Sequence, residues 1–228
     1  MIGKLYIVAT PIGNLEDITL RAIRILSEAD IILAEDTRVT QKLLSHLSTN
    51  YSLQTTNLKS YHQHSRDSKK LEILRYLVEG KNVALVTDAG TPGISDPGNE
   101  LIDFLIEKEP KIKIVPIPGA SAITTALSVS GFNVNKFVFL GFLPKKKRNK
   151  LFEWLKNGKI SFAFYESPKR ISKTLEVLKE EFGEDKRILV AREMTKLHET
   201  LYRGYIKEVI SKLSDGVIKG EIVVVVEV

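Results

Sequence analysis

The sequence has 228 residues, of which 34 are Lys or Arg and 28 are Asp or Glu, so its formal net charge at pH 7 is +6. With 43% apolar and 27% charged residues, it has the composition of a folded globular protein and not of a disordered chain. Cysteine is absent, which excludes disulfides, thiolate catalysis, cysteine-ligated zinc and iron–sulfur clusters. The positive charge is a weak indication of a polyanionic partner.

The apolar runs near the two ends are short. Residues 5–9 are too few for the apolar region of a signal peptide, and Ile222–Val226 is far below the ~18 residues that span a bilayer. We therefore expect a cytoplasmic protein without a membrane segment.

Apolar runs rich in β-branched residues alternate with amphipathic patterns of helical period. Most of the runs are continuously apolar, as is typical of strands covered on both faces. The predicted strands are 4–9, 30–35, 82–87, 111–116, 136–142, 159–165, 187–192 and 221–228. The predicted helices are 18–26, 37–47, 65–78, 98–108, 120–130 and 168–181.

This alternation predicts an α/β fold with mostly parallel sheets. The stretch Pro116-Ile117-Pro118-Gly119 interrupts the pattern midway, so we predict two α/β domains, residues 1–117 and 118–228. The polar stretch 50–65 is predicted to be an irregular connection, and Trp154 is expected to pack a helix of the second domain.

Turns rich in glycine and proline follow several predicted strands. The turn at 87–98 combines Gly90, Gly93 and Gly98 with two prolines and two aspartates, between a buried strand and a helix. Open α/β sheets bind ligands at the carboxyl ends of their strands, so a binding loop is favoured over an inert turn. Neither a dinucleotide-binding fingerprint nor a P-loop motif occurs.

Cationic and histidine-containing stretches are candidate polyanion contacts. The densest is 145–150 (Lys-Lys-Lys-Arg-Asn-Lys), which predicts either a solvated loop or a site of phosphate contact. His62 and His64 form a pair without an evident acidic partner, so we expect RNA contact or simple exposure and no metal. Aromatic residues between 132 and 165 could stack on bases, although most such aromatics belong to a core.

Short motifs along nearly the whole sequence occur in the order found in one known family. They are 10–15 (Thr-Pro-Ile-Gly-Asn-Leu), 34–38 (Ala-Glu-Asp-Thr-Arg), 88–98, 118–122, 141–144 (Gly-Phe-Leu-Pro) and 164–168 (Phe-Tyr-Glu-Ser-Pro). In these motifs the sequence resembles the bacterial ribosomal RNA small-subunit methyltransferase I family of the tetrapyrrole-methylase-like superfamily. It departs from the family in having Ser65-Arg66 where Asn-Glu is usual, and it ends before the helical extension that many members carry.

The resemblance implies a homodimer whose two α/β domains enclose a cleft for the cofactor S-adenosylmethionine. It implies methylation of the ribose 2′-hydroxyl of a cytidine in the decoding region of 16S rRNA, with the 30S subunit as partner. The cofactor-binding positions carried over from it are Pro11, Gly13, Asp88, Gly90, Thr91, Gly93, Ile94, Ser121, Ala122, Tyr165, Ala191, Arg192 and Gly220. The expected RNA-binding residues are His62, His64, Lys145, Lys146, Lys147, Arg148, Lys169 and Arg170.

Methyl transfer to a hydroxyl depends on positioning, because acceptor oxygen, methyl carbon and sulfur must lie nearly in line. A neutral ribose hydroxyl is a poor nucleophile, so a nearby base or cation would help. The candidates for this role, among which the sequence does not select, are Glu35, Asp36, Arg38, Glu166, Lys169, Arg170 and Glu193. For residues 35–38, a helix cap with a local ion pair is an equally good interpretation.

Two other functions are consistent with the sequence. A methylase of small tetrapyrroles would share the two-domain fold, but the basic stretch at 145–150 favours RNA. A non-catalytic RNA-binding module would leave the loop at 87–98 unexplained.

Overall fold

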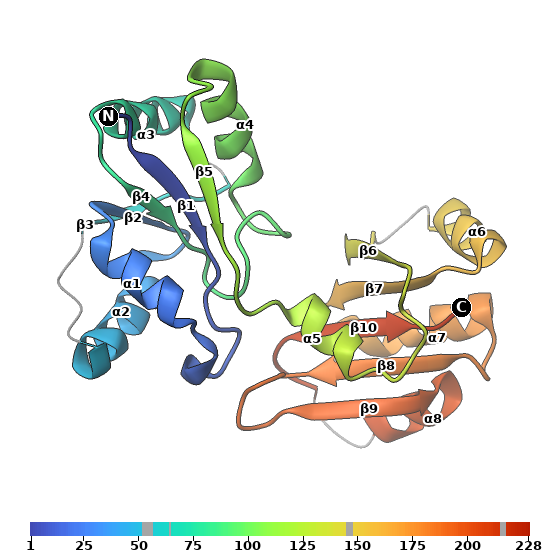
Figure 1. Ribbon diagram of the computed structural model, residues 1–228. Helices are drawn as coiled ribbons and strands as arrows, with labels where there is room; N and C mark the ends of the chain where they lie inside the picture. Colours follow the sequence, from blue (N-terminus) through green and yellow to red (C-terminus); the bar gives the residue numbers. More distant parts are fainter. Residues whose placement is uncertain (52–56, 64, 145–147, 215–217) are drawn as a thin grey trace. The chain divides into compact units, whose positions relative to one another are not determined.

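The computed structural model describes residues 1–51, 57–63, 65–144, 148–214 and 218–228 (Figure 1). His64 and the lysines Lys145, Lys146 and Lys147, all expected to contact RNA, lie outside these ranges. The chain divides into two compact units, Met1–Ser121 and Ala122–Val228. The first unit ends four residues past the boundary expected after residue 117, and within it the Thr91 hydroxyl donates to the Ala120 carbonyl at 3.1 Å.

The N-terminal unit is a parallel sheet with strand order β3-β2-β4-β1-β5, which confirms the predicted parallel arrangement for this half. Its strands are β1 (Lys4–Val8), β2 (Ile31–Ala34), β3 (Asn57–Ser60), β4 (Val83–Leu85) and β5 (Lys113–Ile117). Its helices are α1 (Leu20–Glu28), α2 (Thr37–Tyr51), α3 (Asp67–Val78) and α4 (Asn99–Lys108), preceded by the 3₁₀ turn η1 (Leu15–Asp17).

Apolar side chains cover both faces of this sheet. On one face Leu26 of α1 and Leu47 of α2 pack against Ile32, and on the other Ile73 of α3 and Leu101 of α4 pack against Leu33. Adjacent residues of β2 therefore point into opposite cores. This explains why the strand has no polar position and reads as a continuous apolar run.

Of the two edge strands of this sheet, β3 was not predicted from the sequence, whereas β5 was. β3 lies in the stretch 50–65, which was expected to be irregular, and among the described residues it pairs with β2 alone. The strand predicted at 111–116 is confirmed as β5, which includes Pro116 opposite Ile7 and continues one residue further, to Ile117. Because β5 pairs on one side only, the missing proline N–H breaks no ladder bond.

The C-terminal unit contains a mixed sheet with strand order β6-β7-β10-β8-β9. Its strands are β6 (Phe137–Phe142), β7 (Ser161–Glu166), β8 (Arg187–Arg192), β9 (Thr200–Tyr205) and β10 (Ile222–Val226). The α/β class is confirmed, but the expectation of mostly parallel strands does not hold for this sheet, where only β6 and β7 are parallel. The link from β8 to β9 spans only 193–199, too short for the crossover that a parallel pair needs.

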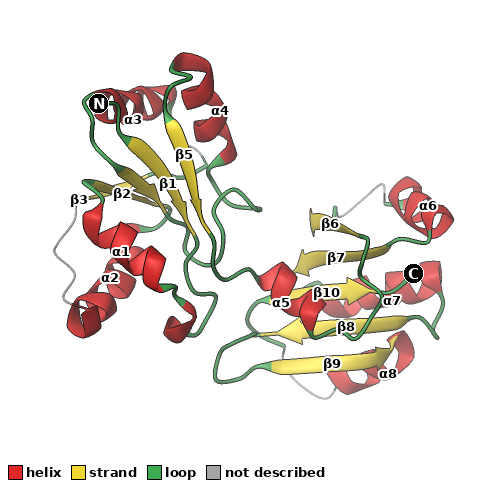
Figure 2. Cartoon of the chain, in the orientation of Figure 1, coloured by secondary structure: helices red, strands yellow, loops and turns green. Residues whose placement is uncertain are grey.

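Helices cover both faces of this second sheet (Figure 2). They are α5 (Ala122–Ser128), α6 (Asn149–Gly158), α7 (Ile171–Phe182) and α8 (Ile206–Leu213). Phe162, Phe164 and Val224 belong to the main core with α6, α7 and α8, while α5 contacts β7 and β10.

Trp154 does not pack as expected. It lies on α6 with 52% of its surface exposed, while Phe152 and Leu155 occupy the inward face of that helix. No helix in the described part of the chain is long and apolar enough to cross a membrane.

Candidate functional site

The loops that follow β1, β4 and β5 are joined to one another at the carboxyl edge of the N-terminal sheet. Thr10 and Gly90 exchange two backbone hydrogen bonds of 2.9 and 3.0 Å. Thr91, in the loop after β4, bonds the carbonyl of Ala120 after β5. Because β4, β1 and β5 are neighbours in the sheet, the predicted loop at 87–98 lies where parallel sheets bind ligands.

Two glycines of that loop have backbone conformations that other residues rarely adopt. Gly90 and Gly93 have φ angles of 85° and 83°, which favour glycine. A Cβ atom on Gly93 would lie 2.6 Å from Oδ1 of Asn99, whose Nδ2 donates to the Gly93 carbonyl at 2.8 Å. The glycines therefore allow close packing of the backbone, with Ile94 left exposed at the surface.

Carboxylates from two strand ends converge beside the loop. Oδ1 of Asp88 accepts the Asp36 N–H at 3.0 Å, and Oε2 of Glu35 accepts the Thr87 hydroxyl at 2.8 Å. Partial burial raises the pKa of Asp88, and the nearby charges of Glu35 and Asp36 raise it further. A cationic ligand at this edge would relieve that repulsion.

Asp36 and Arg38 form a bidentate ion pair. Nη2 of Arg38 lies 2.6 Å from Oδ2 of Asp36, and Nε lies 3.0 Å from Oδ1. The hydrogen bonds from Arg38 lower the pKa of Asp36 to about 2. Asp36 is therefore a weak proton acceptor, while the Arg38 side chain stays 86% exposed.

The remaining residues predicted to border the cofactor in this half lie in the same loops. Pro11 is buried and Gly13 is exposed in the loop after β1, and Ser121 is partly exposed in the loop after β5. The neighbouring Ala122 is partly exposed and begins α5 in the C-terminal unit.

A second group of predicted cofactor residues shares one end of the C-terminal sheet. In the strand register Ile222 lies opposite both Glu166 and Arg192, so the ends of β7 and β8 meet the start of β10. Four predicted cofactor residues therefore lie at the same end of this sheet: Tyr165, Ala191, Arg192 and Gly220. Arg192 is partly exposed and donates from Nη1 to the Lys219 carbonyl at 3.2 Å.

The Glu193 side chain links the chain segments at this end of the C-terminal sheet. Its Oε1 accepts the Glu221 N–H at 2.8 Å and the Lys196 ammonium at 2.9 Å. A Cβ atom on Gly220 would lie 2.2 Å from this carboxylate, and Gly220 has a φ of 90°. Burial opposes the charge of Glu193, but these donors lower its pKa overall, so the residue serves as a structural clamp and not as a base.

Glu166 does not fit the role of base. Its side chain is fully buried, Oε1 accepts the Ser167 N–H at 2.8 Å, and Oε2 accepts the Thr174 hydroxyl at 2.7 Å. Nε of Arg170 also lies 3.3 Å from Oε1. A carboxylate whose two oxygens are engaged in the core has no access to an outside hydroxyl, so this sequence prediction is corrected to a structural role.

Arg170 is likewise engaged within the fold. Besides Glu166, its Nη2 donates to the Leu143 carbonyl at 2.7 Å, which ties the end of β6 to the start of α7. Of the other described residues expected to contact RNA, Lys169 and His62 are exposed and Arg148 is partly exposed, with its guanidinium over the Phe152 ring.

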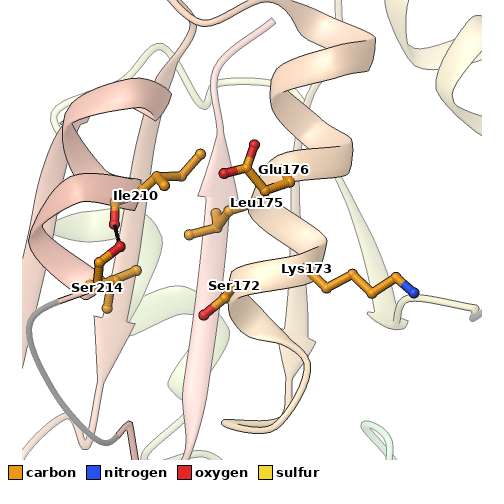
Figure 3. A pocket seen from close by; sticks show the side chains of 7 residues that line it. Ser172, Lys173, Leu175, Glu176, Ile210 and Ser214 are labelled. Carbon is orange, nitrogen blue, oxygen red and sulfur yellow. Dashed lines mark hydrogen bonds between the residues drawn. The ribbon is translucent and has the colours of Figure 1, made fainter.

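A surface hollow between α7 and α8 contains none of the predicted site residues (Figure 3). Ser214 donates to the Ile210 carbonyl at its rim, and Lys173 points away from α8. It is lined by Ser172, Lys173, Leu175, Glu176, Ile210, Leu213 and Ser214.

This fold and the arrangement of its strand ends define a known class of methyltransferases. The family model described as Tetrapyrrole (Corrin/Porphyrin) Methylases matches residues 4–210. The structure is similar to the methyltransferase CobJ (TM-score 0.71, 19% identity, covering 98% of this chain and 93% of that one). It is also similar to the cobalt precorrin-4 methyltransferase CbiF (TM-score 0.70, 21% identity, covering 97% and 94%). At these identities the likeness shows the fold alone.

Sequence comparison is more specific. The chain is 48% identical to Ribosomal RNA small subunit methyltransferase I of Thermotoga maritima over 98% of this chain and 97% of the relative. It is 46% identical to the protein of the same name from Halalkalibacterium halodurans, over 99% of this chain and 76% of the relative. The chain belongs to the tetrapyrrole methylase family and, within it, to the ribosomal RNA small subunit methyltransferase I family.

Proposed function

We propose that this protein transfers a methyl group from S-adenosylmethionine to small-subunit ribosomal RNA, at the ribose 2′-hydroxyl of a cytidine in the decoding region of 16S rRNA. The observation that carries the proposal is the 48% identity to a ribosomal RNA methyltransferase over 97% of that relative's length. The substrate is the 30S subunit in the cytoplasm, and the active form is a homodimer.

The residues in the loops at the carboxyl ends of β1, β4 and β5 have the charge and the backbone conformations that suit the methyl donor. S-adenosylmethionine is a cation that supplies an electrophilic methyl group when bound. Asp88, whose pKa is raised by partial burial and by the nearby carboxylates of Glu35 and Asp36, would gain from the positive charge of the donor. Gly90 and Gly93 let backbone amides approach it closely. Pro11, Gly13, Thr91, Ile94, Ser121 and Ala122, together with Tyr165, Ala191, Arg192 and Gly220, remain its proposed contacts.

Among the candidate bases, Glu35 fits the chemistry best. Asp36 is paired with Arg38 and weakly basic, and Glu166 is enclosed in the core. Glu35 is only partly buried, and within the described part of the chain its Oε1 has no hydrogen-bond partner. The Thr87 hydroxyl orients its other oxygen, which leaves Oε1 to accept the proton of the attacking hydroxyl.

Incubation of unmethylated 30S subunits with labelled S-adenosylmethionine, followed by mapping of the labelled nucleotide, tests the proposal. Label on the 2′-oxygen of a decoding-region cytidine is the expected result. Label on a corrin precursor, with none on 30S subunits, would contradict it.

Asp88→Ala is expected to weaken binding of S-adenosylmethionine by about 10- to 100-fold, since a hydrogen bond or contact to a charged group contributes about 1.5–3 kcal/mol. Calorimetric titration measures this change. Asp103→Ala, which removes an exposed carboxylate from α4 in the same unit, is the matched control and is expected to leave affinity unchanged. Wild-type affinity in Asp88→Ala would remove this residue from the site.

Replacing Lys145, Lys146 and Lys147 together with Ala is expected to lower RNA affinity and to flatten its dependence on salt, because each lost phosphate contact reduces the slope by about 1. Affinity for S-adenosylmethionine should not change. Replacement of Lys108, Lys111 and Lys113, between α4 and the start of β5, removes the same charge as a control. Equal salt slopes for the two triple variants would show that residues 145–147 are ordinary surface.

A further inference from the structure

Phe142 is turned out of the core by an irregularity in β6. Val138 and Leu140 of this edge strand pack against the main core, so regular alternation would carry Phe142 inward as well. Instead the register with β7 shifts between Phe139 and Phe142, and Gly141 takes a φ of 60°. Phe142 is consequently 59% exposed, and Leu143 is buried in its place. Such bulges re-aim side chains, often beside functional sites.

Neighbouring rings hold Phe142 in place. Its ring centroid lies 5.6 Å from that of Tyr165 at an interplanar angle of 61°, and Tyr165 lies 5.0 Å from Phe139 at 70°. These edge-to-face contacts are the preferred geometry of aromatic pairs. Phe142 therefore presents an apolar surface that is supported from one side.

The backbone beside Phe142 is anchored as well. Arg170 donates to the Leu143 carbonyl at 2.7 Å, and the buried carboxylate of Glu166 orients Arg170. A ligand that stacks on Phe142 would not have to order this side chain, which lowers the entropy cost of binding.

The charge next to this aromatic surface favours a polyanion. Lys169 follows β7 four positions after Tyr165, is exposed, and has no carboxylate within 4.0 Å in the described part of the chain. The stretch 145–150, which carries five cations, begins three positions after Phe142 in the sequence. An exposed aromatic ring in a segment that also carries an exposed lysine is the combination that binds single-stranded nucleic acid, in which bases stack and phosphates pair with Lys.

We propose that Phe142 is a base-stacking residue. The base of an unpaired nucleotide of the RNA substrate lies against the exposed face of its ring. The inference rests on the proposed function for the presence of RNA and assigns a recognition role to the Gly141–Pro144 motif. Stacking tolerates any base, so Phe142 contributes affinity and placement of the strand, while base identity is read elsewhere.

Phe142→Ala and Phe142→Leu are expected to weaken binding of a single-stranded decoding-region oligoribonucleotide about tenfold, and Phe142→Trp to restore it, because only Trp keeps a stacking face. The salt slope should match that of the wild type. Phe137→Ala is the matched control. It removes a phenyl ring that is 40% exposed at the other end of β6, roughly 16 Å away along the strand.

Wild-type RNA affinity in Phe142→Leu would overturn the inference, as would a change of oligomeric state in Phe142→Ala, which would show that a second copy of the chain covers this ring. Circular dichroism of each variant verifies folding, and Phe142→Leu keeps the apolar volume should the alanine variant unfold. If the wild type binds the RNA but transfers no methyl group, the proposed function fails while the Phe142 variants still decide stacking. If the wild type binds no RNA, both fail.

Discussion

Glu35→Gln is expected to lower kcat for RNA methylation by at least about a hundredfold, since a positioned general base contributes 10²–10⁴-fold. The amide oxygen of Gln can still accept the Thr87 hydroxyl, so the local structure is retained while the proton acceptor is lost. KM for RNA should change little. Single-turnover methylation with labelled donor measures the effect.

Asp36→Asn is the control for this prediction, because it alters the neighbouring carboxylate and its pair with Arg38. With a pKa of about 2, Asp36 is too weak a base to replace Glu35. A smaller kcat loss in Glu35→Gln than in Asp36→Asn would show that the charge pair, and not Glu35, matters for the chemical step.

Glu166→Ala is expected to lower the free energy of unfolding by about 3 kcal/mol, because it leaves the Thr174 hydroxyl and the Arg170 guanidinium without their buried acceptor. For a chain of this length the melting temperature should fall by roughly 6–12 °C. Thermal unfolding followed by circular dichroism measures the change.

Glu176→Ala provides the comparison for Glu166. It removes a glutamate from α7 whose side chain is 47% exposed and whose ion pair with Lys179 lies on the surface, so it should cost less than about 0.5 kcal/mol. Equal losses of stability in the two variants would contradict the structural role of the buried carboxylate.

The strands that sequence patterns predict well are the covered ones. β2, β8 and β10 are buried on both faces, so every position is apolar or nearly so, and the run is visible without knowing its neighbours. β3 and β9 lie at sheet edges with mixed polar and apolar residues. Nothing in their composition distinguishes them from loops, and only pairing with β2 and β8 makes them strands.

The site shows the same division. The loop at 87–98 is recognisable from its glycines and prolines, and its three glycines, Gly90, Gly93 and Gly98, have positive φ angles. The sequence does not show that Glu166 and Arg170 have partners. Glu166 accepts a hydrogen bond from Thr174, and Arg170 donates one to the Leu143 carbonyl, and folding alone brings these groups together. The outward turn of Phe142 is equally hidden, since the Phe–Val–Phe–Leu alternation before it predicts the opposite side.

The sequence by itself determined the α/β class, the covered strands, the glycine loop and the family, because these depend on local periodicity, backbone conformation and motif order. The tertiary structure alone decided the mixed order of the C-terminal sheet and which charges are buried. It also decided that the Glu35 carboxylate keeps one oxygen without a hydrogen bond among the described residues, and that the Phe142 ring faces outward. These properties arise from contacts between residues far apart in the chain, and burial and electrostatics act through space and not along the sequence.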